Sequence, residues 1–209
     1  MGVIYNRLAG QEVGRIAALS DGIFAVAMTL LVLDIHIPEK ADVHSEAELW
    51  AGLVALSPRL VSWLMSMMTL GIFWLGQQTQ LNHLSRADRN LSWLHFVFLA
   101  VVSLMPFSTR LLAEFFDYRI AFFAYWVNIL LAGGALFFCW FYAERAKLIR
   151  EDAPPGLGSA VCRRIVYAQA LYAFGAALGF IHVGIGVTFI SLVQLNYVIA
   201  PRLPFLYKL

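Results

Sequence analysis

The sequence predicts an all-α integral membrane protein with six transmembrane helices in a single domain, residues 1–209. The first observation is composition: the chain is 61% hydrophobic and 13% charged, whereas a soluble domain has about 25% charged residues. The second is a mean hydropathy of +0.73. The third is that the apolar residues fall into six runs separated by charged residues, Pro or Gly. A net charge of only +2, with no basic patch, argues against a nucleic-acid partner.

The first apolar run extends from residue 15 to about residue 35. As a helix, residues 16–35 span about 30 Å, the thickness of the hydrocarbon core of a bilayer. Asp21 lies inside this helix. A carboxylate there is costly unless it faces protein or water, so Asp21 is a candidate functional residue. Pro38 is expected to end the helix, and the acidic stretch 39–48 is expected to be a solvated loop.

The other runs are placed at residues 49–75, 91–105, 120–142, 165–181 and 183–200. The second run contains Ser57-Pro58-Arg59, which allows two arrangements: one long kinked helix, or a helix that begins at Pro58 after a separate turn. Gln77-Gln78 are expected to close this helix, and Pro106 is expected to close the next one.

The distribution of positive charge predicts the orientation in the membrane. Six helices place both termini on one side, and eleven Lys and Arg residues fall in the segments of that side. They are Arg7, Arg15, Arg86, Arg89, Arg145, Lys147, Arg150, Arg163, Arg164, Arg202 and Lys208. The opposite loops hold Lys40, Arg110 and Arg119, with Arg59 left out of the comparison. Because cytoplasmic loops carry the excess of Lys and Arg, both termini are expected in the cytoplasm.

Residues 15–34 read R-I-A-A-L-S-D-G-I-F-A-V-A-M-T-L-L-V-L-D. This stretch resembles the first-helix signature of the prokaryotic relatives of transmembrane protein 175, the endosomal and lysosomal potassium channel. The Phe-Ser-Asp triplet of that family is present as Leu19-Ser20-Asp21. The resemblance continues in Trp74, Arg86-x-Asp88, Trp93-Leu94 and residues 103–109. Two departures are Gln77-Gln78, where the family often has two His residues, and His95, where it often has Asn.

The resemblance implies a homotetrameric channel in the plasma membrane of a prokaryote. It would pass monovalent cations, potassium in preference to sodium, through a pore lined by the first helix of each subunit. Val26 would form the hydrophobic constriction, and Thr29, Leu30 and Leu33 would line the pore beyond it. Asp34 would lie at the pore entrance, where it could raise the local cation concentration. No cofactor, metal ion or catalytic residue is implied.

The resemblance also implies a structural network around Arg15, Ser20 and Asp21 that holds the pore helix in register. His83 and Asn90 are the expected partners of Asp21. The residues alone leave a simpler arrangement open, in which Ser20 and Asp21 cap a helix that starts late. Likewise, the stripe of Leu19, Gly22, Val26, Thr29, Leu30 and Leu33 would then be an ordinary packing face.

Two other functions are compatible with the sequence. The first is a small secondary transporter or proton-coupled permease, with Asp21 as the carboxylate that binds and releases protons. Transporters have broken helices near the midplane, and the first helix shows no such break. The second is a membrane enzyme or assembly factor. The sequence has no HExxH, GxSxG or P-loop motif, so an enzyme is not expected.

Overall fold

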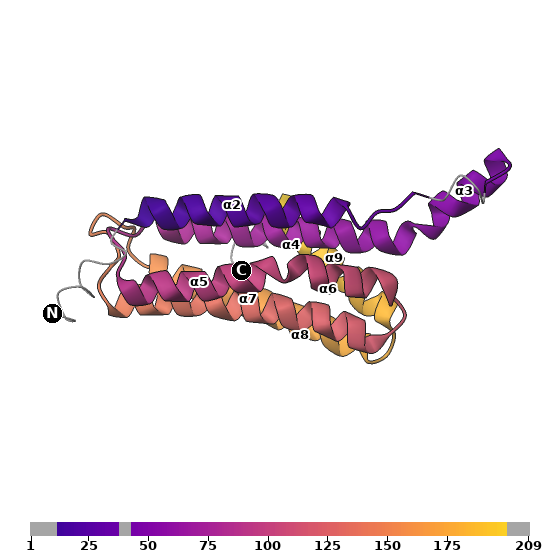
Figure 1. The fold of residues 1–209 in the computed structure, drawn as a ribbon. Helices are drawn as coiled ribbons and strands as arrows, with labels where there is room; N and C mark the ends of the chain where they lie inside the picture. Colours follow the sequence, from indigo (N-terminus) through magenta and orange to yellow (C-terminus); the bar gives the residue numbers. More distant parts are fainter. Residues whose placement is uncertain (1–11, 38–42, 200–209) are drawn as a thin grey trace.

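The computed structural model describes residues 12–37 and 43–199, and in these ranges the chain is helical apart from turns and one isolated β-bridge. The helices are α2 (Val13–Val32), α3 (Glu46–Ala55), α4 (Ser57–Asn82), α5 (Arg89–Ser103), α6 (Met105–Glu114), α7 (Arg119–Arg145), α8 (Leu157–Gly179) and α9 (Val183–Ile199). The long helices run side by side, and α3 projects from one end (Figure 1). The prediction of an all-α protein is confirmed for the described residues.

Four helical stretches of the described chain are long and apolar enough to cross a membrane: Val13–Val32, Ser57–Asn82, Arg89–Glu114 and Arg119–Arg145. The third of these combines α5 and α6. α8 has 23 residues but includes Arg163 and Arg164, and α9 is apolar but has only 17 residues. The protein is therefore a multi-pass membrane protein, and the count of six spans stays a prediction.

Two prolines expected to mark breaks lie in the first turn of a helix. α3 ends at Ala55, and α4 begins at Ser57 with Pro58 directly after it. Of the two arrangements, the helix that begins at Pro58 is close to what is observed, although α3 and not a turn precedes it. Pro106 likewise lies in the first turn of α6. Proline is tolerated there because the first N–H groups of a helix have no partner within it.

One expected helix end was wrong, and two others were displaced by two or three residues. α4 continues to Asn82, so Gln77 and Gln78 lie inside it and do not close it. α5 ends at Ser103, two residues before the expected end at residue 105, but α6 follows directly and was not expected. α2 ends at Val32, three residues before the expected end, and Pro38 lies outside the described residues.

Polar side chains in the middle of the bundle join α4, α6, α7 and α9. Gln194 Nε2 donates to Thr69 Oγ1 at 2.6 Å, and the Tyr125 hydroxyl lies 3.0 Å from the same oxygen. Ser66 Oγ lies 2.7 Å from Thr109 Oγ1 and 3.3 Å from the Tyr125 hydroxyl. All five side chains are buried. Because a bilayer core offers no water to replace these bonds, they fix the positions of four helices relative to one another.

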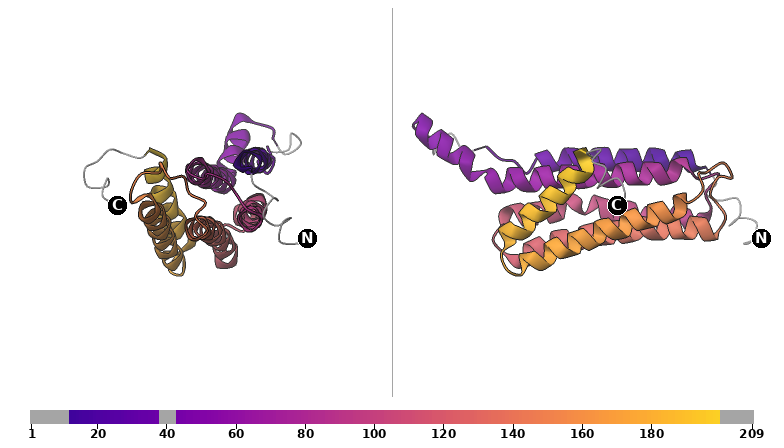
Figure 2. Two further views of the ribbon diagram at one scale, coloured as in Figure 1. Left: turned by 90° about the vertical axis from the view of Figure 1, so that its left-hand side faces the viewer. Right: turned by 180° about the vertical axis from the view of Figure 1, so that it is seen from behind.

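α8 and α9 form a tight hairpin, in which α8 runs beside α7 and α9 crosses the bundle obliquely (Figure 2). Their backbones approach closely at Gly186. A Cβ atom at this residue would lie 2.9 Å from the Gly175 carbonyl oxygen and 3.0 Å from the Gly179 Cα atom. Small residues at such a crossing allow helices in a membrane to pack backbone to backbone.

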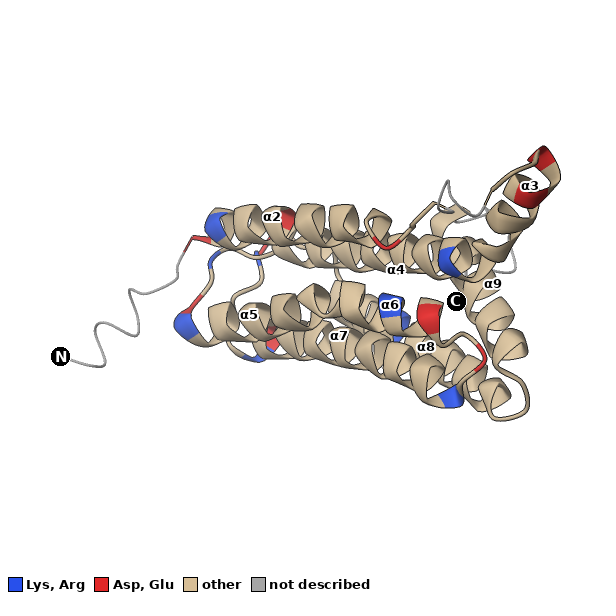
Figure 3. Cartoon of the chain, turned by 45° about the vertical axis from the view of Figure 1, so that its right-hand side comes forward, with Lys and Arg blue, Asp and Glu red and all other residues tan. Residues whose placement is uncertain are grey.

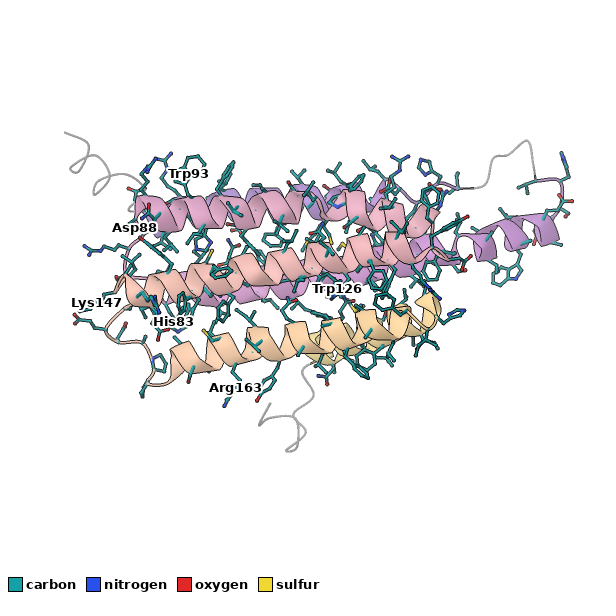
Figure 4. The ribbon with its side chains drawn as sticks, turned by 90° about the horizontal axis from the view of Figure 1, so that it is seen from below. His83, Asp88, Trp93, Trp126, Lys147 and Arg163 are labelled. Atoms are coloured by element: carbon teal, nitrogen blue, oxygen red, sulfur yellow. The ribbon has the colours of Figure 1, made fainter. Side chains whose placement is uncertain are left out.

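At one end of the bundle, the α4–α5 loop is bonded to the α7–α8 loop. Ser85 N donates to the Leu148 carbonyl oxygen at 2.8 Å, and Arg150 N donates to the His83 carbonyl oxygen at 2.9 Å. Figure 4 shows His83, Asp88 and Lys147 together at this end. Lys147 has a φ of 53°, the left-handed conformation that often follows the end of a helix.

Charged residues gather mainly toward the two ends of the bundle (Figure 3). The end where α2 and α5 begin holds most of the described cations: Arg15, Arg86, Arg89, Arg145, Lys147, Arg150, Arg163 and Arg164. The other end holds Arg59, Arg110 and Arg119. The remaining cations of the orientation argument, Arg7, Lys40, Arg202 and Lys208, lie outside the described residues.

Candidate functional site

α2 has one buried face and one exposed face. Ser20, Phe24, Ala27 and Leu31 are buried against the rest of the chain. The exposed face carries four of the residues that the sequence assigns to the pore and its signature: Leu19 is 49% exposed, Val26 58%, Leu30 44% and Leu33 67%. α2 lies at the periphery of the bundle, beside α4 (Figure 2). The stripe is therefore not a packing face within this chain.

The exposed stripe borders an open apolar groove with a volume of 430 Å³. The residues that line the groove are Ala18, Leu19, Gly22, Ile23, Val26, Ala27, Leu30 and Ser103. Gly22 has no neighbour within 4 Å of an added Cβ atom, so the surface is open at this level of the helix. Seven of the eight residues belong to α2, and the groove follows this helix.

Thr29 is the one polar residue of the predicted pore segment between Gly22 and Leu33. Its hydroxyl donates to the carbonyl oxygens of Ala25 at 3.0 Å and Val26 at 2.9 Å, within its own helix. The proton of the hydroxyl is thus directed at the backbone, while the oxygen stays on the exposed side of α2. An oxygen placed in this way can accept from water or contact a cation.

Ser20 connects α2 to α4 inside the subunit. Its hydroxyl donates to the Ile16 carbonyl oxygen at 2.7 Å and accepts from Gln77 Nε2 at 2.9 Å. Gln77 Nε2 also lies 3.3 Å from His95 Nδ1, which brings α5 into the same chain of contacts. Ser20 and Gln77 are fully buried, and His95 is 1% exposed. A buried polar connection thus lies directly behind the exposed stripe.

Asp21 connects α2 to the exposed side of α4. Its Oδ1 atom accepts from Trp74 Nε1 at 2.8 Å and from Gln78 Nε2 at 3.0 Å. Trp74, Gln77 and Gln78 lie three and four residues apart, so they share one face of α4. This spacing is visible in the sequence and marks a polar face of α4, but the register of α2 against α4 decides which residues that face meets.

The structure corrects three details of the sequence analysis. Ser20 and Asp21 do not cap a helix, because α2 begins at Val13 and they lie well inside it. His83 and Asn90 are not the partners of Asp21. His83 Nδ1 donates to the Thr79 carbonyl oxygen at 2.7 Å, and Asn90 Nδ2 donates to the Tyr142 hydroxyl at 3.1 Å.

The structure brings Ser20 and Asp21 together but leaves the other two predicted polar residues apart from them. Arg15 is exposed on the first turns of α2, and its side chain makes no hydrogen bond or ion pair with the described residues. Asp34 follows the end of α2, where Arg110 Nε lies 3.8 Å from its Oδ1 atom. The sequence analysis used Arg110 only to predict the orientation in the membrane and did not connect it to Asp34. Over residues 12–37 and 43–199, no cluster of His, Cys, Asp or Glu is arranged to hold a metal ion.

Comparisons with known proteins match this architecture. A family model described as endosomal/lysosomal potassium channel TMEM175 matches residues 15–106. A potassium channel of Chamaesiphon minutus is 32% identical over 186 residues, which cover 86% of this chain and 91% of that protein. The crystal structure of a lysosomal potassium-selective channel TMEM175 homolog from the same organism superposes with a TM-score of 0.77. It is 26% identical and is matched over 92% of this chain and 99% of that one.

Other relatives match only part of the chain. A potassium channel of Streptomyces collinus is 40% identical over 104 residues, 50% of this chain and 49% of that protein. The human endosomal/lysosomal proton channel TMEM175 is 32% identical over 106 residues, 48% of this chain and 21% of that protein. The matched residues thus span about half the length of the Streptomyces protein and about a fifth of the human one.

The apolar helical bundle defines a multi-pass α-helical membrane protein, and the relatives that it matches are ion channels. The chain belongs to the TMEM175 family, as a member of its prokaryotic branch. The family resemblance of the sequence is thereby confirmed. The expectation that the protein is not an enzyme is confirmed by the same membership, because its family and structural neighbours are ion channels.

Proposed function

We propose that this chain forms a homotetrameric potassium channel of a prokaryotic plasma membrane, with both termini in the cytoplasm. In this proposal α2 of each copy faces a central pore. Val26 forms the constriction, Thr29, Leu30 and Leu33 line the pore beside it, and Asp34 lies at one entrance. The permeant ion is potassium, and no cofactor takes part.

One observation carries the proposal: the exposed face of α2 is apolar and lies close to a charged residue. A charged side chain in contact with lipid at a membrane-spanning helix costs at least about 2.5 kcal/mol. Asp21 is exposed in the isolated chain and immediately precedes Gly22 of the stripe. Asp21 lies about 100° around the helix from Gly22, so it borders the stripe and does not belong to it. The surface of α2 that joins Asp21 to the stripe is therefore better placed against water and other copies of the chain than against lipid.

A ring of Val26 side chains would select ions differently from a filter of backbone carbonyl groups. An apolar constriction acts by dewetting, so an ion passes it only by losing part of its hydration shell. Potassium loses water more readily than sodium, which favours potassium to a moderate degree. Thr29 oxygens would supply the polar contacts next to the constriction. Val is smaller than Leu or Ile, so the ring would be comparatively wide.

In the same proposal, Arg15, Ser20 and Asp21 keep α2 at the right rotation and height. Ser20 and Asp21 bond to α4 on both sides of the helix, which turns the apolar stripe away from the bundle. Arg15 is exposed and would act at the interface with a neighbouring copy or with lipid headgroups.

The Val26→Ser substitution tests the pore assignment. A polar ring is easier to hydrate, so potassium flux into proteoliposomes should rise several-fold and the preference over sodium should fall. Val32→Ser is the matched control: Val32 is also a valine of α2 and is 50% exposed, but it lies on another face of the helix. Equal potassium flux in Val26→Ser and the wild type would show that Val26 does not form the constriction.

A proton-coupled transporter is the alternative, and one observation favours it. Asp21 bonds through Oδ1, and within the described chain its Oδ2 atom has no partner, so this oxygen is accessible for a proton. Asp21→Asn separates the two functions. In a channel, the amide keeps an acceptor for Trp74, and flux persists. In a transporter, the loss of the titratable group abolishes flux that depends on a proton gradient.

A further inference from the structure

Two side chains of opposite charge lie at the end of the bundle where α2 stops. Asp34 follows α2 by two residues, and Nε of Arg110, on α6, lies 3.8 Å from its Oδ1 atom. The Arg110 side chain is 64% exposed and that of Asp34 is 24% exposed. Solvent screens an exposed pair, so its contribution to folding is small. The pair matters here because it determines the net charge at the end of the bundle where α2 stops.

A second ion pair leaves Arg110 directed at Asp34. Glu114 lies four residues after Arg110 on α6, the spacing at which side chains of a helix meet. However, Arg59 Nη2 of α4 donates to both carboxylate oxygens of Glu114, at 3.1 and 3.2 Å. Glu114 is thus bound to α4. Among the described residues, Asp34 is the acid within ion-pair distance of Arg110.

We propose that Arg110 is a conductance-determining residue, which cancels the negative charge of Asp34 at this mouth of the pore. The proposal rests on the proposed function, in which α2 lines the pore and Asp34 lies at its entrance. Every copy contributes one Asp34 and one Arg110, so the two charges sum to zero for any number of copies. Asp34 alone would attract cations to the mouth, and Arg110 removes most of that attraction.

Single-channel currents of the full-length protein test this in symmetrical potassium chloride. The Debye length falls from about 30 Å at about 0.01 M to about 3 Å at about 1 M, so an effect of mouth charge is large at low salt and absent at high salt. For Arg110→Gln we expect a conductance about twofold or more above wild type at the low concentration and equal to it at the high one. The change should be larger for current that enters at this mouth, which produces rectification.

Three further variants separate charge from shape. Arg110→Lys keeps the charge and is expected to match wild type. Asp34→Asn leaves Arg110 unopposed and is expected to lower the low-salt conductance about twofold. Arg119→Gln is the matched control, because it removes a cation from the first residue of α7 at the same end of the bundle. It is expected to conduct as wild type does.

The outcomes distinguish failure of this proposal from failure of the proposed function. Equal low-salt conductance in Arg110→Gln and wild type overturns the role of Arg110. A conductance change that Arg110→Lys also shows would overturn this role too, because it would indicate an effect of side-chain shape. The same holds for a conductance change that persists at about 1 M salt, where charge is screened. If Arg110→Gln does not assemble, Asp34→Asn decides: unchanged conductance overturns the proposal and a low-salt loss supports it. A wild-type protein that conducts no ion overturns the channel itself.

Discussion

At the scale of single residues, Ser20 and Asp21 have opposite environments although they are neighbours. Ser20 is buried and its hydrogen bonds remain inside the subunit, whereas Asp21 is exposed and bonds along the surface of α4. Successive residues of a helix are about 100° apart, so the pair reaches two sides of the same neighbour. This places two contacts around α2 and restrains its rotation.

Asp21→Ala is expected to destabilise the subunit by about 1–2 kcal/mol, because Trp74 Nε1 and Gln78 Nε2 lose their acceptor. The oligomer should weaken more than the subunit, since α2 would be free to rotate. Denaturant titration of the purified protein and size-exclusion chromatography measure the two effects. Asp21→Asn, which retains an oxygen acceptor, serves as the control. A fully stable oligomer in Asp21→Ala would show that these bonds do not hold α2.

The residues around Asp21 could be predicted only in part. The signature itself is local in sequence and identified Ser20 and Asp21. Their partners are more than fifty residues away, and a search guided by polarity chose His83 and Asn90. His83 instead bonds to Thr79 within α4, and Asn90 of α5 bonds to Tyr142 of α7. Which polar groups meet depends on the register of α2 against α4, and composition carries no information about register.

At the scale of helices, two prolines lie next to breaks in the chain, and α6 after the second of these breaks was not expected. The helix before Pro106 ends at Ser103, close to the expected end, but Pro106 itself lies in the first turn of α6. Pro38, which was expected to end α2, lies outside the described residues. The hydropathy of residues 89–114 continues across the break, so two short helices together are long and apolar enough to span the membrane. The hydrophobic runs therefore predicted which segments are helical. A proline, in contrast, is compatible both with the end of one helix and with the first turn of the next.

The crossing of α8 and α9 gives a prediction at the same scale. Gly186→Ala is expected to destabilise the protein by about 1–3 kcal/mol, because the added methyl group meets backbone atoms at 2.9 and 3.0 Å that cannot rotate away. Gly134→Ala in α7, where nothing lies within 4 Å, is the matched control and should be neutral or stabilising by up to about 1 kcal/mol. Thermal unfolding in detergent measures both. Equal melting temperatures for the two variants would contradict this packing.

At the scale of the whole molecule, composition alone established the class. A chain with 13% charged residues has too few of them for the surface of a soluble domain of this length. The helical bundle, with four helical stretches long and apolar enough to cross a membrane, agrees with that inference. The number of spans was harder to predict. α8 combines 23 helical residues with two adjacent arginines, and α9 has only 17 residues, so neither follows the simple rule of length and hydropathy.

Assembly is the prediction at this scale. The stripe of α2 is exposed among residues 12–37 and 43–199, and the proposed channel needs several copies to close a pore. Native mass spectrometry in mild detergent is expected to give four copies of the 23.4-kDa chain. A Leu30→Glu variant, which places a charge on the 44% exposed position of the stripe, should shift the protein toward smaller species. A monomeric wild type would exclude a pore between copies.

The bonding of α2 has a consequence for how this protein can diverge between species. The side-chain hydrogen bonds that hold α2 all run to α4, within the stretch matched by the family model. The Streptomyces relative and the human protein each match about half of this chain. α2, which lines the pore in the proposed function, and the α4 side chains that bond to it thus both lie within residues 15–106, the part that the family model matches. We expect the later helices, α7 to α9, to vary more in sequence between relatives, provided that their side chains still fill the space behind α4.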